Sequence, residues 1–229
     1  MTPPDVGVVI VAAGAGTRAA GSELKQFRWI AGKPMLLHSI QLFQERSDVA
    51  MVVAVLPREY VADPPPWIFQ SDTDRLLVSV GGRERKDSVR NGLEDLPEAC
   101  TIVVVHDAAR PLVTAAVASR VIDEARKGNC AVPGLPMVDT VKSADESGRV
   151  ARTVDRNGLF RIQTPQAFPR EILEQAYMSS GDDPAATDDA MLCERIGASV
   201  VIVPGSPRAI KITTDDDFAV AEALSILRE

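Results

Sequence analysis

Residues 8–27 read VVIVAAGAGTRAAGSELKQF, and this segment decides the fold. It begins as an apolar run, turns through a glycine-rich stretch and carries two cations, Arg18 and Lys25. An apolar run bounded by glycine is typical of a buried parallel strand. Glycines let main-chain N–H groups approach an anion without a Cβ in the way, and the two cations can bind phosphate oxygens. The segment therefore predicts a strand followed by a phosphate-binding turn.

Two common phosphate-binding motifs do not fit this turn. There is no GxxxxGK[ST], which excludes a P-loop, and no third glycine at the spacing of GxGxxG, which disfavours a dinucleotide fold. What remains is AAGxGTR followed by a lysine. That pattern resembles the signature of sugar-nucleotide pyrophosphorylases and cytidylyltransferases. The alternative is a glycine-rich turn with two solvated basic residues.

Composition limits the classes of protein that fit. A chain of 229 residues with 45% hydrophobic residues suits a single α/β domain. The net charge of -7 disfavours general binding to nucleic acid or to acidic membranes. The apolar runs are too short to span a bilayer, and the N-terminus lacks a targeting pattern, so we expect a cytoplasmic protein. Three cysteines without metal-ligand spacing are expected to be buried apolar residues: Cys100, Cys130 and Cys193.

Strand-like and helix-like segments alternate along the chain. Apolar runs typical of strands occur at residues 6–11, 49–56, 76–80, 102–105, 131–135 and 199–203. Helical spacing occurs at residues 34–46, 86–96, 115–127, 170–178, 188–196 and 216–227. The alternation predicts one three-layer α/β/α, Rossmann-like domain over residues 1–229, with a mostly parallel sheet. Ligands of such sheets bind at the carboxyl ends of the strands.

One segment interrupts the alternation. Residues 138–155 read VDTVKSADESGRVARTVD, two polar β-like arms around Glu146-Ser147-Gly148. The pattern predicts a hairpin with too few apolar residues to be core. It is either an arm that packs on a partner subunit or a solvated hairpin.

Two further segments carry candidate chemistry. Residues 81–89, GGRERKDSV, follow a strand and open a helix; they are either a base-recognition loop or a simple βα turn. Asp107 in HDAARP ends an apolar strand, where an unpaired carboxylate would be costly. A Mg²⁺ ion would offset that cost, and so would an internal ion pair with Arg110. His106 is expected to be a structural hydrogen-bonding group.

The ordered motifs together resemble one family closely. They are AAGxGTR, KQF, KPML, GGxxRxxSV, HDAARP, DTVK, TVDRxGL, QTPQ, TDDA and IKIT. This set is similar to that of the 2-C-methyl-D-erythritol 4-phosphate cytidylyltransferases of the non-mevalonate isoprenoid pathway, over residues 8–227. The resemblance is to the monofunctional form, so no cyclase-like extension is expected after Glu229. It implies a nucleotidyltransferase fold and transfer of CMP from CTP, with Mg²⁺.

The resemblance also implies roles for particular residues. Arg18, Lys25 and Lys211 match catalytic cations, and Asp107 matches the metal-associated aspartate. CTP-binding positions match Ala12, Ala13, Gly14, Ala15, Gly16, Gly81, Gly82 and Ser88. Acceptor-binding positions match Arg110, Thr140, Arg156 and Thr164. The hairpin, about residues 137–158, matches an arm exchanged in a homodimer, so Thr140 and Arg156 are expected to serve the partner's site.

The sequence departs from the family's pattern at two positions. Val11 and Leu24 stand where the family often has proline; because proline fixes φ, we expect the loop carrying Lys25 to be more mobile.

Three other functions are alternatives to the methylerythritol enzyme. They are a ribitol 5-phosphate cytidylyltransferase, a non-catalytic nucleotide-binding regulator and a structural oligomer. HDAARP and TVDRNGL favour the methylerythritol enzyme, and a structural protein would not need cations at every loop.

Overall fold

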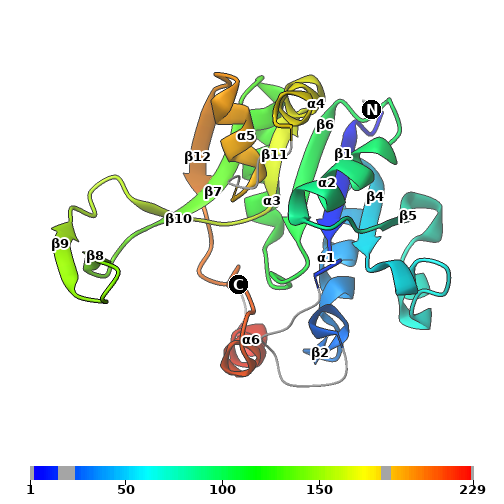
Figure 1. Ribbon diagram of the computed structural model, residues 1–229. Coiled ribbons are helices and arrows are strands. Elements are labelled where there is room, and N and C mark those ends of the chain that lie inside the picture. Colours follow the sequence, from blue (N-terminus) through cyan, green and yellow to red (C-terminus); the bar gives the residue numbers. More distant parts are fainter. Residues whose placement is uncertain (1–2, 15–23, 182–186, 228–229) are drawn as a thin grey trace.

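A computed structural model describes residues 3–14, 24–181 and 187–227 (Figure 1). The strands of its main sheet are β1 (Val6–Val11), β4 (Val49–Leu56), β5 (Leu76–Val80), β6 (Ile102–Asp107), β7 (Cys130–Pro136), β10 (Phe160–Ile162), β11 (Gln166–Pro169) and β12 (Val200–Pro204). The helices are α1 (Met35–Gln44), α2 (Arg85–Glu94), α3 (Ala115–Arg126), α4 (Arg170–Ser179), α5 (Asp189–Arg195) and α6 (Asp215–Ile226). Short 3-10 turns include η1 (Lys25–Phe27) and η2 (Arg58–Tyr60).

The main sheet is mostly parallel, as predicted. Its order is β10-β7-β11-β6-β1-β4-β5, with β12 also paired to β7. Strands β5, β4, β1 and β6 run parallel to one another, and β12 runs parallel to β7. Strands β10 and β11 are antiparallel to their neighbours, and the sequence analysis did not predict either one. The predicted strand and helix ranges otherwise agree with the structure within about two residues per end.

Two helical layers cover the sheet, because side chains of a strand alternate between its faces. Val8 and Ile10 of β1 pack in one apolar cluster with residues of α1 and α3. Val9 packs in a second cluster with residues of α2, α4 and α5. The three-layer α/β/α arrangement is therefore confirmed. All three cysteines are buried in this core.

A small subdomain of α6 and a two-stranded ribbon lies beside the carboxyl edge of the sheet (Figure 1). The ribbon pairs β2 (Trp29–Ile30) with β3 (Lys33–Pro34). Ile30, Ile212 and Phe218 form its apolar cluster, and the Arg28 guanidinium lies 3.8 Å from the Phe218 ring centre. This packing fixes the segment that contains Lys211. Residues 210–213, which include Lys211, do not form a strand; Ile212 N–H donates to Ala109 O at 2.8 Å.

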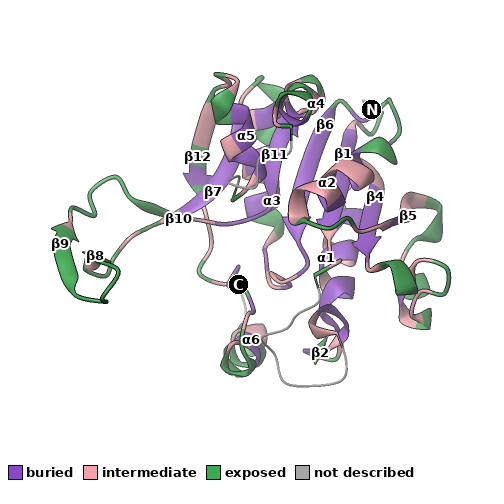
Figure 2. Cartoon of the chain, in the orientation of Figure 1, coloured by how far each residue is buried: buried purple, intermediate pink, exposed green. Residues whose placement is uncertain are grey.

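The hairpin arm forms as predicted. Strands β8 (Val141–Ala144) and β9 (Val150–Val154) are antiparallel, and Gly148 in the turn has φ +78°, which glycine adopts readily. The arm projects from the body of the molecule, and most of its residues are exposed (Figures 1 and 2). Val138 and Val150 are 67% and 63% exposed. An isolated two-stranded hairpin is at best marginally stable in water, so the arm needs something to pack against.

Candidate active site

Cavities line the carboxyl ends of the parallel strands. One of about 90 Å³ lies beside Ala12, Gly14 and Lys25. A second of about 310 Å³ lies beside Ala13, Arg58 and the glycine pair 81–82. A third of about 240 Å³ includes Arg85, Asp107, Arg110, Thr164 and Lys211. A larger groove of about 490 Å³ lies elsewhere, between α2 and α4, and contains none of the expected site residues.

The start of the glycine turn is held by a buried glutamine. Gln26 donates through Nε2 to the carbonyl oxygens of Ala12 at 2.6 Å and Gly14 at 3.3 Å. These contacts fix the backbone where it leaves β1. Three of the expected phosphate-binding residues, Ala15, Gly16 and Arg18, lie outside the described residues, so their roles stay predictions.

Lys25 lies in η1, at the mouth of the smallest cavity. Its Nζ donates to Ile212 O at 2.7 Å, which places the ammonium beside the segment that carries Lys211. Residues 187 positions apart in the sequence are thereby brought together. Leu24 has φ −61°, the value at which proline would fix the backbone, so the substitution leaves the local conformation compatible with the family's proline.

The glycine pair at residues 81–82 is required by packing. A Cβ on Gly81 would lie 2.1 Å from the Cβ of Ala13, and one on Gly82 would lie 2.1 Å from the Cβ of Asp87. Protein atoms therefore occupy the space beside both glycines, a requirement that a simple βα turn shares with a base-recognition loop. Ser88 is buried, and its hydroxyl accepts from Gly82 N–H at 3.1 Å and donates to Glu84 O at 3.2 Å. In this structure Ser88 shapes the loop.

Asp107 lines the third cavity and forms ion pairs with two cations there. Its carboxylate accepts from Lys211 Nζ at 2.7 Å and lies 3.2 Å from Arg85 Nε. Burial alone would raise the pKa of Asp107, but the charges of Arg85 and Lys211 outweigh it and hold the pKa well below its usual range. Asp107 is therefore ionised throughout the physiological range, whereas Lys211, with 46% of its side chain exposed, reaches solvent.

The alternative ion pair between Asp107 and Arg110 does not form. Arg110 instead donates to the carbonyl oxygens of Ala209 at 2.7 Å and Ile162 at 3.4 Å. Arg110 is the nearest arginine in the sequence, but the fold brings Arg85 and Lys211 to the carboxylate from other segments. Arg110 still lines the third cavity and is available there to an anion.

Thr164 and His106 form a buried pair behind Asp107. Thr164 Oγ1 accepts from Asp107 N–H at 3.0 Å and lies 3.1 Å from His106 Nδ1. His106 is fully buried, and burial lowers its pKa to about 4. The imidazole is therefore neutral at pH 7, which agrees with the predicted structural role.

The free energy of unfolding is expected to fall as the pH is lowered from about 6.5 to about 4. In this window the unfolded chain binds a proton at His106 and the folded chain does not, so acid favours unfolding. The full window corresponds to about 3 kcal/mol. Urea titrations at several pH values would measure it, and His106→Asn should flatten the slope. Burial also lowers the pKa of His38, so the slope that remains in His106→Asn should disappear when His38→Asn is added to it. An equal slope in wild type and His106→Asn would contradict the assignment.

Two expected acceptor-binding residues lie away from these cavities. Thr140 and Arg156 are exposed at the base of the arm, and Arg156 Nη1 contacts Val138 O. Neither lines a cavity with Asp107 or Lys25. The structure of one chain therefore does not bring them to its own site.

Several site residues were missed by sequence reasoning. Gln26 lies in the quoted KQF motif, and Arg85 is the arginine of GGxxRxxSV. Arg83 and Lys86 stand beside Arg85, and its position in that motif was the one sequence signal that distinguished it from them. Asp189, in TDDA, is 1% exposed and bonded to Arg85, a contact that only the fold reveals.

Gly14 after β1, the cations Lys25 and Lys211 and the buried Asp107 carboxylate lie at the carboxyl edge of an α/β sheet, an arrangement that suits the nucleotide phosphates on which a nucleotidyltransferase acts. The family model for IspD, 2-C-methyl-D-erythritol 4-phosphate cytidylyltransferase, matches residues 6–229. The chain belongs to this family.

Individual proteins similar to this chain carry names of the same family. A protein of that name from Syntrophus aciditrophicus is 42% identical over 224 residues, covering 96% of this chain and 95% of the relative. A bifunctional enzyme IspD/IspF from Solidesulfovibrio magneticus is 42% identical over 225 residues, covering 94% of this chain and 56% of the relative. The crystal structure of the cytidylyltransferase from Thermus thermophilus has a TM-score of 0.81 at 33% identity, covering 97% of this chain and all of that one. No helix in the described parts of the chain has the length and apolar character to cross a membrane.

Proposed function

We propose that this site transfers CMP from CTP to 2-C-methyl-D-erythritol 4-phosphate, giving 4-diphosphocytidyl-2-C-methyl-D-erythritol and pyrophosphate. Family membership supports the reaction. The observation that carries the site assignment is the convergence of Lys25, Lys211 and Asp107 from three separate segments at the carboxyl edge of the sheet. Gly14, which follows β1, lines a cavity at the same edge.

The chemistry needs positioning more than acid–base catalysis. The acceptor phosphate is already an anionic nucleophile, so no general base is required. The site has to align that phosphate with the α-phosphate of CTP and stabilise the charge that develops as pyrophosphate leaves. Lys25 and Lys211 would bind those oxygens, and Arg18 is expected to join them. Neutral, buried His106 takes no part in proton transfer.

Base and acceptor are assigned to different cavities. The cavity of about 310 Å³ beside Ala13 and Gly81 suits the cytosine and ribose, because it adjoins the glycine turn. The cavity of about 240 Å³ suits the acceptor phosphate, because Arg110 and Lys211 supply cations and Thr164 supplies a hydroxyl.

A Mg²⁺ ion fits this site only together with CTP. Asp107 is a single carboxylate, and the described residues contain no cluster of three or more acidic, His or Cys side chains that could hold a metal. Mg²⁺ commonly binds through one or two carboxylates and substrate phosphates, which matches this donor set. Asp107 would hold the ion, and the ion would neutralise charge on the phosphates when bound.

Asp107→Asn is expected to raise the Mg²⁺ concentration for half-maximal activity by about tenfold or more. Asparagine keeps the shape but removes the charge that binds a hard cation. A Mg²⁺ titration of pyrophosphate release would measure the shift, with melting temperatures to confirm that the variant folds. Asp123→Asn, at an exposed position of α3, is the matched control. An unchanged titration would show that Asp107 only pairs with Arg85 and Lys211.

The acceptor is tested by competition. Pyrophosphate release should be efficient with 2-C-methyl-D-erythritol 4-phosphate, and ribitol 5-phosphate should be a weak acceptor and a weak inhibitor. A higher kcat/KM with ribitol 5-phosphate would reverse the assignment.

The active form is proposed to be a homodimer in the cytoplasm, with each arm contributing Thr140 and Arg156 to the partner's site. Two observations and one general property support this proposal. The arm projects from the body of the molecule (Figure 2), and it exposes Val138 and Val150. A lone hairpin is at best marginally stable in water.

A further inference from the structure

A line of alternating charges runs from the third cavity into the core. Lys211 Nζ lies 2.7 Å from Asp107 Oδ2, and Asp107 Oδ1 lies 3.2 Å from Arg85 Nε. Arg85 also donates through Nη1 to Asp189 Oδ2 at 2.8 Å. The line ends at Tyr177, whose hydroxyl donates to Asp189 Oδ1 at 2.5 Å. The four charges sum to zero, and among the described residues two side chains donate to each carboxylate.

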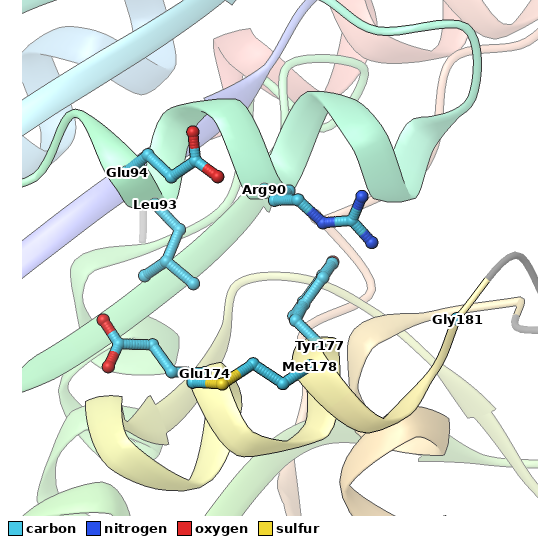
Figure 3. A pocket seen from close by; sticks show the side chains of 7 residues that line it. All are labelled: Arg90, Leu93, Glu94, Glu174, Tyr177, Met178 and Gly181. Atoms are coloured by element: carbon cyan, nitrogen blue, oxygen red, sulfur yellow. The ribbon is translucent and has the colours of Figure 1, made fainter.

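The inner end of this line is anchored by packing. Asp189 is 1% exposed and Tyr177 is 4% exposed. Tyr177 reaches from α4 toward α2 beside the groove between these helices, with Arg90 over its ring at 6.0 Å (Figure 3). Gln166 of β11 fixes the start of α5 by donating to Asp188 at 2.9 Å and accepting from Ala190 N–H at 3.3 Å. The Asp189 carboxylate is therefore held by Tyr177 of α4 and by Arg85, and β11 fixes the residues on either side of Asp189.

The outer end of the line, at Lys211, is more exposed to solvent than the inner end. Lys211 is the most exposed member of the line and faces the cavity assigned to the acceptor phosphate. A bound phosphate would compete with Asp107 for its ammonium. Asp107 would then keep Arg85 as its ion-pair partner among the described residues. A buried carboxylate that loses its partners is strongly disfavoured, so Arg85 allows Lys211 to engage substrate without displacing Asp107.

We propose that Arg85 is a positioning residue for the reaction: it ties Asp107 to the buried Asp189–Tyr177 pair. The inference rests on the proposed function and adds residues that act through Asp107. Arginine suits this role because its planar fork binds two carboxylates at once, which the single ammonium of lysine does less well.

A double-mutant cycle tests the proposal. Arg85→Gln is expected to lower kcat/KM for pyrophosphate release by about ten- to a hundredfold in the wild-type background. In the Asp107→Asn background the same change should have an effect of about threefold or less, because the group that Arg85 positions is already altered. Arg85→Lys should retain more activity than Arg85→Gln but less than wild type.

The inner end is tested by removing a single hydroxyl. Tyr177→Phe keeps the packed ring and is expected to lower kcat/KM by about two- to tenfold, again with little effect in the Asp107→Asn background. Arg90→Gln is the matched control. Arg90 lies on α2, the same helix as Arg85, and faces the Tyr177 ring, but no described contact joins it to Asp189. Arg90→Gln should leave kcat/KM unchanged.

Equal effects of Arg85→Gln in both backgrounds would overturn the proposal and show that Arg85 acts on substrate directly or on the fold. Absence of pyrophosphate release by the wild-type chain would instead sink the proposed function. Crystal structures of Tyr177→Phe and Arg85→Lys would show the position of the Asp107 carboxylate independently of any activity measurement. We expect a displaced Asp107 carboxylate in both, and an unmoved carboxylate in both would refute the role.

Discussion

Lys25→Ala is expected to lower kcat by about a hundred- to a thousandfold, with a much smaller change in CTP binding. Lys25 Nζ is held beside the segment carrying Lys211, at the mouth of the cavity next to Gly14. A cation fixed there before substrate arrives stabilises charge that develops at the α-phosphate. Interactions made mainly in the transition state affect turnover more than ground-state binding.

Steady-state pyrophosphate release, with an independent measurement of CTP binding, separates the two effects. Lys127→Ala is a suitable control, because Lys127 is exposed at the end of α3 and pairs only locally with Glu124 in the described contacts. Wild-type turnover in Lys25→Ala would remove Lys25 from the catalytic cations. A loss confined to CTP affinity would restrict it to ground-state binding.

Mixed dimers of two inactive variants are expected to recover activity. Arg156→Ala should be inactive because its arm no longer completes the partner's site, and Lys25→Ala because its own site lacks the cation. A mixed dimer has one site with Lys25 and Arg156 both intact, while the other site lacks both. Random assembly makes about half the dimers mixed, so roughly a quarter of wild-type activity is the ceiling.

The subunits must be allowed to exchange, by co-expression or co-refolding, and mixed dimers must be isolated with two tags. Arg152→Ala, in the exposed strand β9, is the matched control on the same arm and should keep its activity. No recovery in verified mixed dimers would place Arg156 in its own chain's site or outside the site.

Much of the fold was predictable because the core strands are apolar and parallel. The run at residues 6–11 and the helix N-caps at Thr114 and Asp188 are local signals, and the structure has all of them. Strand β11 was missed because its four residues, beginning at Gln166, lack a strand-length apolar run. Its antiparallel place beside β6 depends on tertiary pairing that no local pattern encodes.

The site was predictable in its motifs but not in its contacts. Asp107 was identified by the cost of a carboxylate at the end of a buried strand. Its partners Arg85 and Lys211 are 22 and 104 residues away in sequence, so only the fold could select them over Arg110. Gly81 is a second example. The resemblance made it a CTP-binding position, but only the structure shows that a Cβ there would overlap the Ala13 side chain.

The most direct test follows the oxygen atoms of the acceptor phosphate. The purified chain is incubated with CTP, Mg²⁺ and 2-C-methyl-D-erythritol 4-phosphate carrying ¹⁸O in its phosphate, and both products are analysed by mass spectrometry. The account predicts equal amounts of pyrophosphate and 4-diphosphocytidyl-2-C-methyl-D-erythritol, with all the label in the latter. Label in the pyrophosphate, or no pyrophosphate at all, would contradict direct attack of the acceptor phosphate on CTP at this site.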